Sequence, residues 1–119
     1  RTDSQKEQMM REFATHYNEL LNLLTTDARQ VILMEPFVFP HPEEYETWIP
    51  YVHTMSDIIR QLSVRFGLPF LPLHNYFNKE ATQSGFDAIT TDGIHLTLYG
   101  HKLLAEKLFP LLQSIDNNP

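Results

Sequence analysis

The 119 residues of this chain are 42% hydrophobic and 12% aromatic, a composition typical of one globular domain with a modest core. The formal net charge is −6, from 15 acidic and 9 basic side chains, which argues against a nucleic-acid partner because such partners need clustered Lys and Arg. The absence of Cys excludes disulfides, thiolate catalysis and Cys-bound zinc. No apolar run approaches the roughly 18 residues of a membrane span, so we expect a soluble protein, either cytoplasmic or secreted.

The first third of the chain predicts a helix followed by a strand. Residues 4–24 carry apolar side chains at helical spacing, and Ser4 followed by Glu7 predicts a capping box at the helix start. The residues expected on the buried stripe are Phe13, Tyr17, Leu20, Leu21 and Leu24. The run QVILME (30–35) lacks polar alternation and therefore predicts a short, buried, parallel strand that ends at Pro36.

A proline-rich loop leads from this strand into a second helix, predicted over residues 46–66. Pro50 fits only in the first turn of that helix, and Gly67 is suited to the position just after its end. Trp48 lies on the apolar stripe and is expected in the core. The run LPFLPL (68–73) then predicts a second short strand between prolines.

The last third of the chain predicts helices. Residues 74–85 suggest a short helix and a loop, and Thr97 is a suitable N-cap for a final helix that Pro110 should kink or end. Strands alternating with helices indicate a parallel sheet with right-handed crossovers. Two strands are too few for such a sheet. We therefore expect the remaining strands to come from another polypeptide or from a segment upstream of Arg1.

The candidate functional residues follow the strands, because ligands of open parallel sheets bind beyond the carboxyl ends of the strands. Glu35, His41 and His74 are candidates for lining a substrate pocket there. The sharpest pattern is Asp92 and His95, because an Asp three residues before a His can accept the Nδ1–H bond and leave Nε2 as a base. Gly93 lets the turn between them adopt an unusual backbone conformation.

Simpler interpretations of these residues stay open at this stage. Asp92 could cap a local amide in a surface turn, and Glu35 could cap or form a salt bridge. His101 is better explained as a solvent-facing or packing residue than as a ligand. Zinc held by Asp92, His95 and His101 is disfavoured, since their spacing does not match helical i, i+4 ligand pairs.

The segment DGIHL (92–96), with Gly100, His101 and Ala105 after it, closely resembles the last conserved block of the SGNH (GDSL-type) hydrolases. QVILMEPFVFP (30–40) resembles the fourth strand of that family with its proline-bearing exit loop, and RFGLPFLPLHNYF (65–77) resembles the fifth strand. The opening helix resembles the one before strand four. The likeness covers nearly the whole chain and keeps the order of the segments.

This resemblance implies an α/β fold: a flavodoxin-like, three-layer α/β/α domain with a parallel sheet, of which this chain supplies the last strands and helices. Residues 1–119 would be the C-terminal part of one such domain, an esterase, lipase or acylhydrolase acting on a small-molecule ester. His95 would exchange protons with a nucleophilic serine, and Asp92 would orient the imidazole. No metal or other cofactor is implied.

The departure from the family pattern is that the blocks with the nucleophile and the oxyanion hole are missing. None of the five serines lies in a matching block; they are Ser4, Ser56, Ser63, Ser84 and Ser114. We therefore expect no real esterase activity from the isolated chain, and expect it to self-associate or to pair with an N-terminal half. A non-catalytic half-domain that forms swapped or edge-paired oligomers is the alternative. A flavodoxin-like ligand-binding module is disfavoured by the missing Gly-rich phosphate loop.

Overall fold

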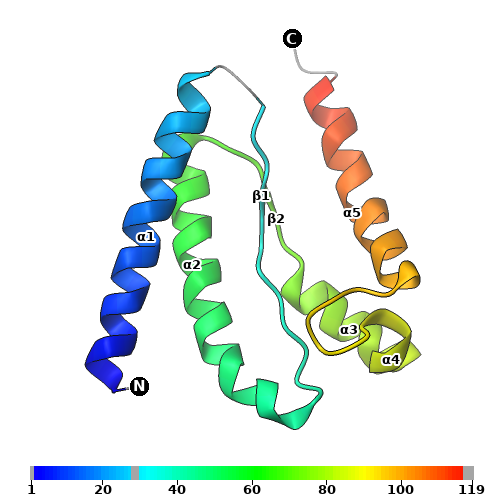
Figure 1. The fold of residues 1–119 in the computed structure, drawn as a ribbon. Helices are drawn as coiled ribbons and strands as arrows, with labels where there is room; N and C mark the ends of the chain where they lie inside the picture. The colour runs from blue at the N-terminus through cyan, green and yellow to red at the C-terminus, as the bar shows by residue number, and fades with distance from the viewer. Residues whose placement is uncertain (1, 28–29, 117–119) are drawn as a thin grey trace. The chain divides into compact units, whose positions relative to one another are not determined.

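The computed structural model describes residues 2–27 and 30–116, most of which are helical (Figure 1). The two short strands pair with each other in one parallel sheet, and Leu33 N–H donates to Pro69 O at 2.9 Å. Elements in chain order are α1 (Asp3–Thr26), β1 (Leu33–Met34), the 3-10 helix η1 (Glu43–Trp48), α2 (Ile49–Phe66), β2 (Phe70–Leu71), α3 (His74–Ser84), α4 (Phe86–Ile89) and α5 (Leu98–Asp116).

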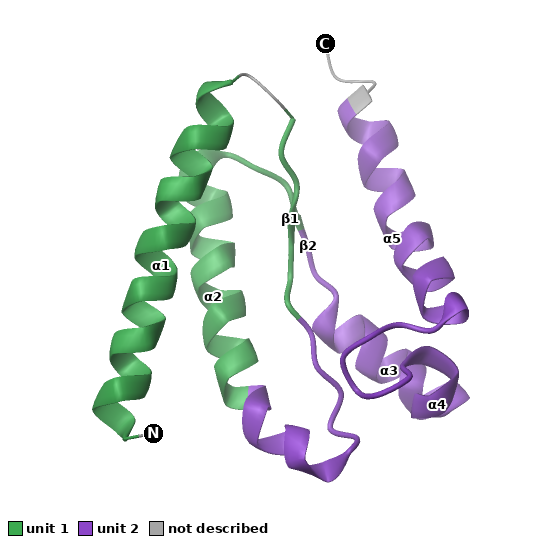
Figure 2. Ribbon diagram, in the orientation of Figure 1, with its two compact units in different colours: residues 1–36, 50–70 green, residues 37–49, 71–119 purple. Residues whose placement is uncertain are grey.

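The predicted alternation of helices and strands is confirmed, although each strand has only 2 residues. In the part of the chain that is described, no helix combines the length and the apolar character required to cross a bilayer. The chain divides into two compact units, coloured in Figure 2. Unit 1 comprises residues 1–36 and 50–70, and unit 2 comprises residues 37–49 and 71–119.

Unit 1 is built around apolar side chains from α1, α2 and the segments that lead into the strands. Leu21 of α1 is 1% exposed, and the partly buried rings of Phe13 and Tyr17 pack on the same cluster. The other buried members are Leu33, Ile59 and Leu62. Burial of an apolar side chain of this size stabilises a fold by about 1.5–3 kcal/mol, so this cluster contributes to the stability of the unit.

Two details predicted for α1 are wrong. The capping box is made by Thr2 and Gln5, not by Ser4 and Glu7, since Thr2 Oγ1 accepts the Gln5 N–H at 3.2 Å and Gln5 Oε1 accepts the Thr2 N–H at 2.8 Å. Leu20 and Leu24, predicted on the buried stripe, are 49% and 38% exposed. Helical spacing specifies which face is apolar, but not how far along the helix the packing partner extends.

The second helix begins in two stages. Residues 43–48 form η1, and α2 starts at Ile49, so Pro50 lies in its first turn as predicted. The C-terminus of α2 is a Schellman motif: Leu68 N–H donates to Ser63 O at 2.8 Å and Gly67 N–H donates to Val64 O at 3.2 Å. Gly67 has φ +66°, a conformation that glycine adopts without strain, as predicted for this position.

Unit 2 has an aromatic core. Phe39 and Phe77 are both fully buried, and the ring of Phe37 lies 4.7 Å from that of Phe77. The ring of Phe86 meets Phe39 edge-on at 6.0 Å, which joins α4 to the segment after β1. Leu71, Leu73, Ala81, Ile89 and Leu103 are the other buried apolar side chains of this core outside residues 37–39.

The last helix, α5, begins as predicted. Thr97 caps it, since Thr97 Oγ1 accepts the Gly100 N–H at 3.0 Å. Pro110 lies inside the helix, which continues to Asp116, so of the two predicted effects, a kink or an end, the end does not occur. Leu98 and Phe109 are 89% and 60% exposed.

Candidate active site

The turn between α4 and α5 is held by a hydroxyl at its base. Thr90 Oγ1 donates to His95 O at 2.7 Å and accepts the Gly93 N–H at 2.8 Å. Thr90 also pairs with Leu96 in an isolated antiparallel bridge. At the far side, Thr97 Oγ1 donates to Ala88 O at 2.6 Å. These bonds close residues 90–97 into a small loop between two helix ends, which gives Asp92 and His95 a fixed backbone frame.

Gly93 forms the tip of this turn and has φ +97°. Its carbonyl accepts the Phe39 N–H at 3.1 Å, so the turn is attached to the segment that follows β1. A Cβ atom at this position would lie 2.5 Å from the His41 carbonyl oxygen and 2.6 Å from the Tyr45 ring. The position therefore requires glycine for two reasons, its backbone conformation and the close approach of residues 41–45.

The carboxylate of Asp92 makes three hydrogen bonds, all within the turn. Oδ1 accepts the Ile94 N–H at 2.9 Å and the His95 N–H at 2.7 Å. Oδ2 lies 2.6 Å from His95 Nδ1. An ionised carboxylate only accepts, so Nδ1 carries the proton and the predicted Asp92–His95 bond is present. Asp92 also caps local amides, as in the simpler interpretation. Oδ1 accepts the two backbone N–H groups, while Oδ2 pairs with the His95 ring.

His95 projects from the turn into solvent. Its side chain is 77% exposed and that of Asp92 is 47% exposed. With Nδ1 bound to the carboxylate, the lone pair of Nε2 faces outward as a proton acceptor. An imidazole held in one tautomer and one orientation is suited to general acid–base chemistry.

The hydrogen bonds from the His95 backbone amide, the His95 ring and the Ile94 amide lower the pKa of Asp92 from 3.8 to about 2. The pKa of Asp92 is lower in the folded than in the unfolded chain. The ionised carboxylate therefore stabilises the fold above about pH 3.8, and this contribution disappears as the pH falls to about 2.

We therefore expect the Asp92 carboxyl carbon, followed by NMR, to titrate with a midpoint near 2. In His95→Leu the midpoint should rise only part of the way to 3.8, since the ring bond is lost but the two backbone amides remain. A wild-type midpoint of 3.8 would contradict the bonded carboxylate.

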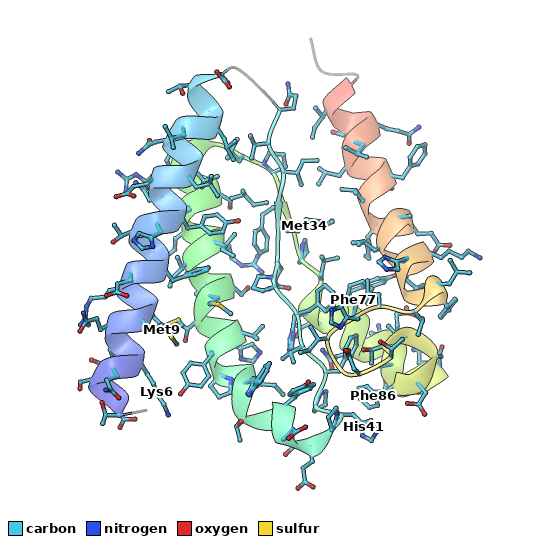
Figure 3. The ribbon with its side chains drawn as sticks, viewed as in Figure 1. Lys6, Met9, Met34, His41, Phe77 and Phe86 are labelled. Atoms are coloured by element: carbon cyan, nitrogen blue, oxygen red, sulfur yellow. The ribbon has the colours of Figure 1, made fainter. Side chains whose placement is uncertain are left out.

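The other predicted pocket residues differ in their surroundings. In unit 2, His41 is exposed and its ring stacks on Phe86 at 5.8 Å (Figure 3). His74, also in unit 2, is 7% exposed, and its Nδ1 accepts the Val38 N–H at 3.3 Å. In unit 1, Glu35 is 9% exposed, accepts a short hydrogen bond from Ser56 Oγ and lies 3.6 Å from an Arg60 nitrogen. Thus only His41 of these three presents its side chain to solvent.

Two further side chains depart from expectation or were not expected. Trp48, predicted in the core, is 47% exposed and lies 4.5 Å from the Tyr45 ring, because η1 replaces the first turn of the predicted helix. Thr90 was not predicted to support the turn. The available signal was a threonine two residues before an Asp-Gly pair, where a hydroxyl can hold a turn amide.

In residues 2–27 and 30–116, no three His, Asp or Glu side chains are grouped as metal ligands. The arrangement is an oriented Asp92–His95 pair in the turn between α4 and α5.

Comparison with solved structures identifies a protein of similar fold. The chain is similar to a "putative GDSL-like lipase" from Parabacteroides merdae ATCC 43184, with 24% identity and a TM-score of 0.76. The match covers 82% of this chain and 47% of that chain, so this chain spans under half the length of that protein. It therefore has the fold of part of a GDSL-like lipase. No family model and no curated protein sequence matches the chain.

Proposed function

We propose that this chain is the C-terminal part of an SGNH (GDSL-type) serine esterase, in which Asp92 and His95 are the acid and base of a Ser-His-Asp triad. The observation that carries this proposal is the 2.6 Å contact between Asp92 Oδ2 and His95 Nδ1, with the outer ring nitrogen directed to solvent. The shared fold with part of a GDSL-like lipase supports it independently.

In this proposal the sheet is extended by strands outside this chain into a flavodoxin-like, three-layer α/β/α domain. In residues 2–27 and 30–116 the sheet has two short strands, which supports that extension because a two-stranded sheet alone is marginal. The nucleophilic serine and the oxyanion hole also come from outside residues 1–119.

The chemistry follows from the orientation of His95. Its Nε2 accepts the proton of the serine hydroxyl as the serine oxygen attacks the ester carbonyl carbon. The imidazolium is stabilised by the Asp92 carboxylate. Nε2 then gives the proton to the departing alkoxide as the carbon–oxygen bond breaks, which leaves an acyl-serine. Water, activated by the same nitrogen, releases the acid and restores the serine.

The test is labelling with a tagged fluorophosphonate, which reacts with activated serines, in the polypeptide that joins this chain to its proposed N-terminal part. We expect one adduct, found by peptide mass spectrometry on a serine outside residues 1–119, and its loss in His95→Ala. His101→Ala is the matched control, because His101 is exposed on α5. An adduct on any serine of this chain, or labelling that is unaffected by His95→Ala, would contradict the proposal.

A further inference from the structure

One face of α3 holds the segment that follows β1. His74, Phe77 and Asn78 occupy positions i, i+3 and i+4, so their side chains share that face. His74 Nδ1 accepts the Val38 N–H at 3.3 Å, and Asn78 Nδ2 donates to the Val38 carbonyl at 3.2 Å. Both polar groups of the Val38 backbone are thus bound by side chains of α3, much as a neighbouring strand would bind them.

Phe77, the apolar residue on this face of α3, packs against the same segment. Phe77 is fully buried, and its ring lies 4.7 Å from that of Phe37 and 6.3 Å from that of Phe39. Val38 is itself only 2% exposed, so water cannot replace the bonds to its backbone. In Figure 3, Phe77 lies beside this segment and His41 lies further along it.

The segment of residues 37–39 is also hydrogen-bonded to the turn of residues 90–97. Phe39 N–H donates to Gly93 O at 3.1 Å, and the His41 carbonyl and the Tyr45 ring enclose Gly93. Gly93 is the residue next to Asp92, and its amide is fixed by Thr90. The order of contacts is therefore α3 side chains, then the Val38 backbone, then Gly93, then the Asp92–His95 pair. All of these residues belong to unit 2.

We propose that His74, with Asn78, is a positioning residue for the Asp92–His95 pair, acting through Val38 and the Phe39–Gly93 hydrogen bond. Its relevance to catalysis rests on the proposed function, but the effect on the pair does not. The role requires a neutral imidazole with its proton on Nε2, since Nδ1 must accept the Val38 N–H. His95 has the opposite tautomer, with its proton on Nδ1.

Comparing two variants of His74 isolates this role. His74→Leu removes the acceptor, whereas His74→Asn retains one, because Asn Oδ1 sits as far from the backbone as Nδ1 of His. Asn75→Leu is the matched control, since Asn75 is exposed on the same helix. Asn78→Ala removes the donor to the Val38 carbonyl and leaves His74 in place, so it decides the question if His74→Leu does not fold.

The readouts are the NMR signal of the His95 Nδ1 proton and the titration midpoint of the Asp92 carboxyl. In folded His74→Leu and Asn78→Ala we expect the Nδ1 proton to be lost to exchange and the Asp92 midpoint to rise by about 1 unit. His74→Asn and Asn75→Leu should match the wild type. A merely stabilising role for His74 would lower the unfolding midpoint in denaturant without moving either signal.

Unchanged Nδ1 and Asp92 signals in the folded variants would overturn the proposal. Failure of His74→Asn to restore the signals that His74→Leu loses would overturn it as well. Neither readout uses a substrate or a serine, so a negative fluorophosphonate result would sink the esterase proposal and leave this one standing, and the reverse also holds.

Discussion

Asp92→Asn is expected to lower kcat/KM for ester hydrolysis by about 10⁴-fold in the polypeptide that joins this chain to its proposed serine-bearing part. Asparagine can keep an oxygen in the place of Oδ1, where it still accepts the Ile94 and His95 amides. It puts an NH2 group opposite His95 Nδ1, however, and two donors cannot pair. The imidazole must then move its proton to Nε2, which removes the base while the turn remains folded.

The same geometry predicts how this variant combines with His95→Ala. If the pair acts as a unit with the serine, the double variant should be no slower than His95→Ala alone, because catalytic losses within a triad are not additive. Asp87→Asn is the control, since Asp87 is an exposed carboxylate on α4. Two outcomes would show that Asp92 only stabilises the turn. One is a loss of kcat/KM in the double variant equal to the product of the two single losses, and the other is a loss of less than about 10-fold for Asp92→Asn.

The sequence predicted the parts of the site that are local. Asp92 and His95 are three residues apart with a glycine between them, so the choice of backbone conformation is small and the hydrogen bond could be anticipated. The N-cap by Thr97 could be predicted for the same reason. In each case the interacting groups lie within one turn of the chain, where residue type and spacing largely determine the geometry.

The contacts that support the site are not local and were missed. His74 and Asn78 bind the backbone of a residue 36 and 40 positions earlier, and nothing in the spacing of either residue specifies that partner. His74 was predicted near a pocket because it follows a strand, yet its side chain turns into the core. Position after a strand defines the edge of a sheet, while packing decides whether a side chain there faces solvent.

Errors along the helices have a comparable origin. Ser4 and Thr2 are both competent caps, and the helix begins at the earlier one because Gln5 completes the reciprocal pair. Trp48 fits a helical stripe in the sequence, but the acidic stretch after Pro42 forms a 3-10 helix, which places the indole on a different face. Periodicity predicts the apolar face correctly only when the helix type is also correct.

Gly93→Ala should be strongly destabilising, lowering the free energy of unfolding by about 3 kcal/mol or more. The added Cβ would lie 2.5 Å from the His41 carbonyl oxygen, a backbone atom that cannot move aside by rotating. The positive φ of +97° adds a conformational cost for any residue with a side chain. Denaturant unfolding of the purified chain measures the sum of both effects.

Gly85→Ala separates the two effects. Gly85 has a similar φ of +89°, but a Cβ there would meet nothing within 4 Å, so its substitution reports conformational strain alone, about 1–2 kcal/mol. The excess loss in Gly93→Ala then measures how closely residues 41–45 pack against the turn of residues 90–97. Equal losses in the two variants would mean that the loop yields, and that the turn holding Asp92 and His95 is fixed only by its own hydrogen bonds through Thr90 and Thr97.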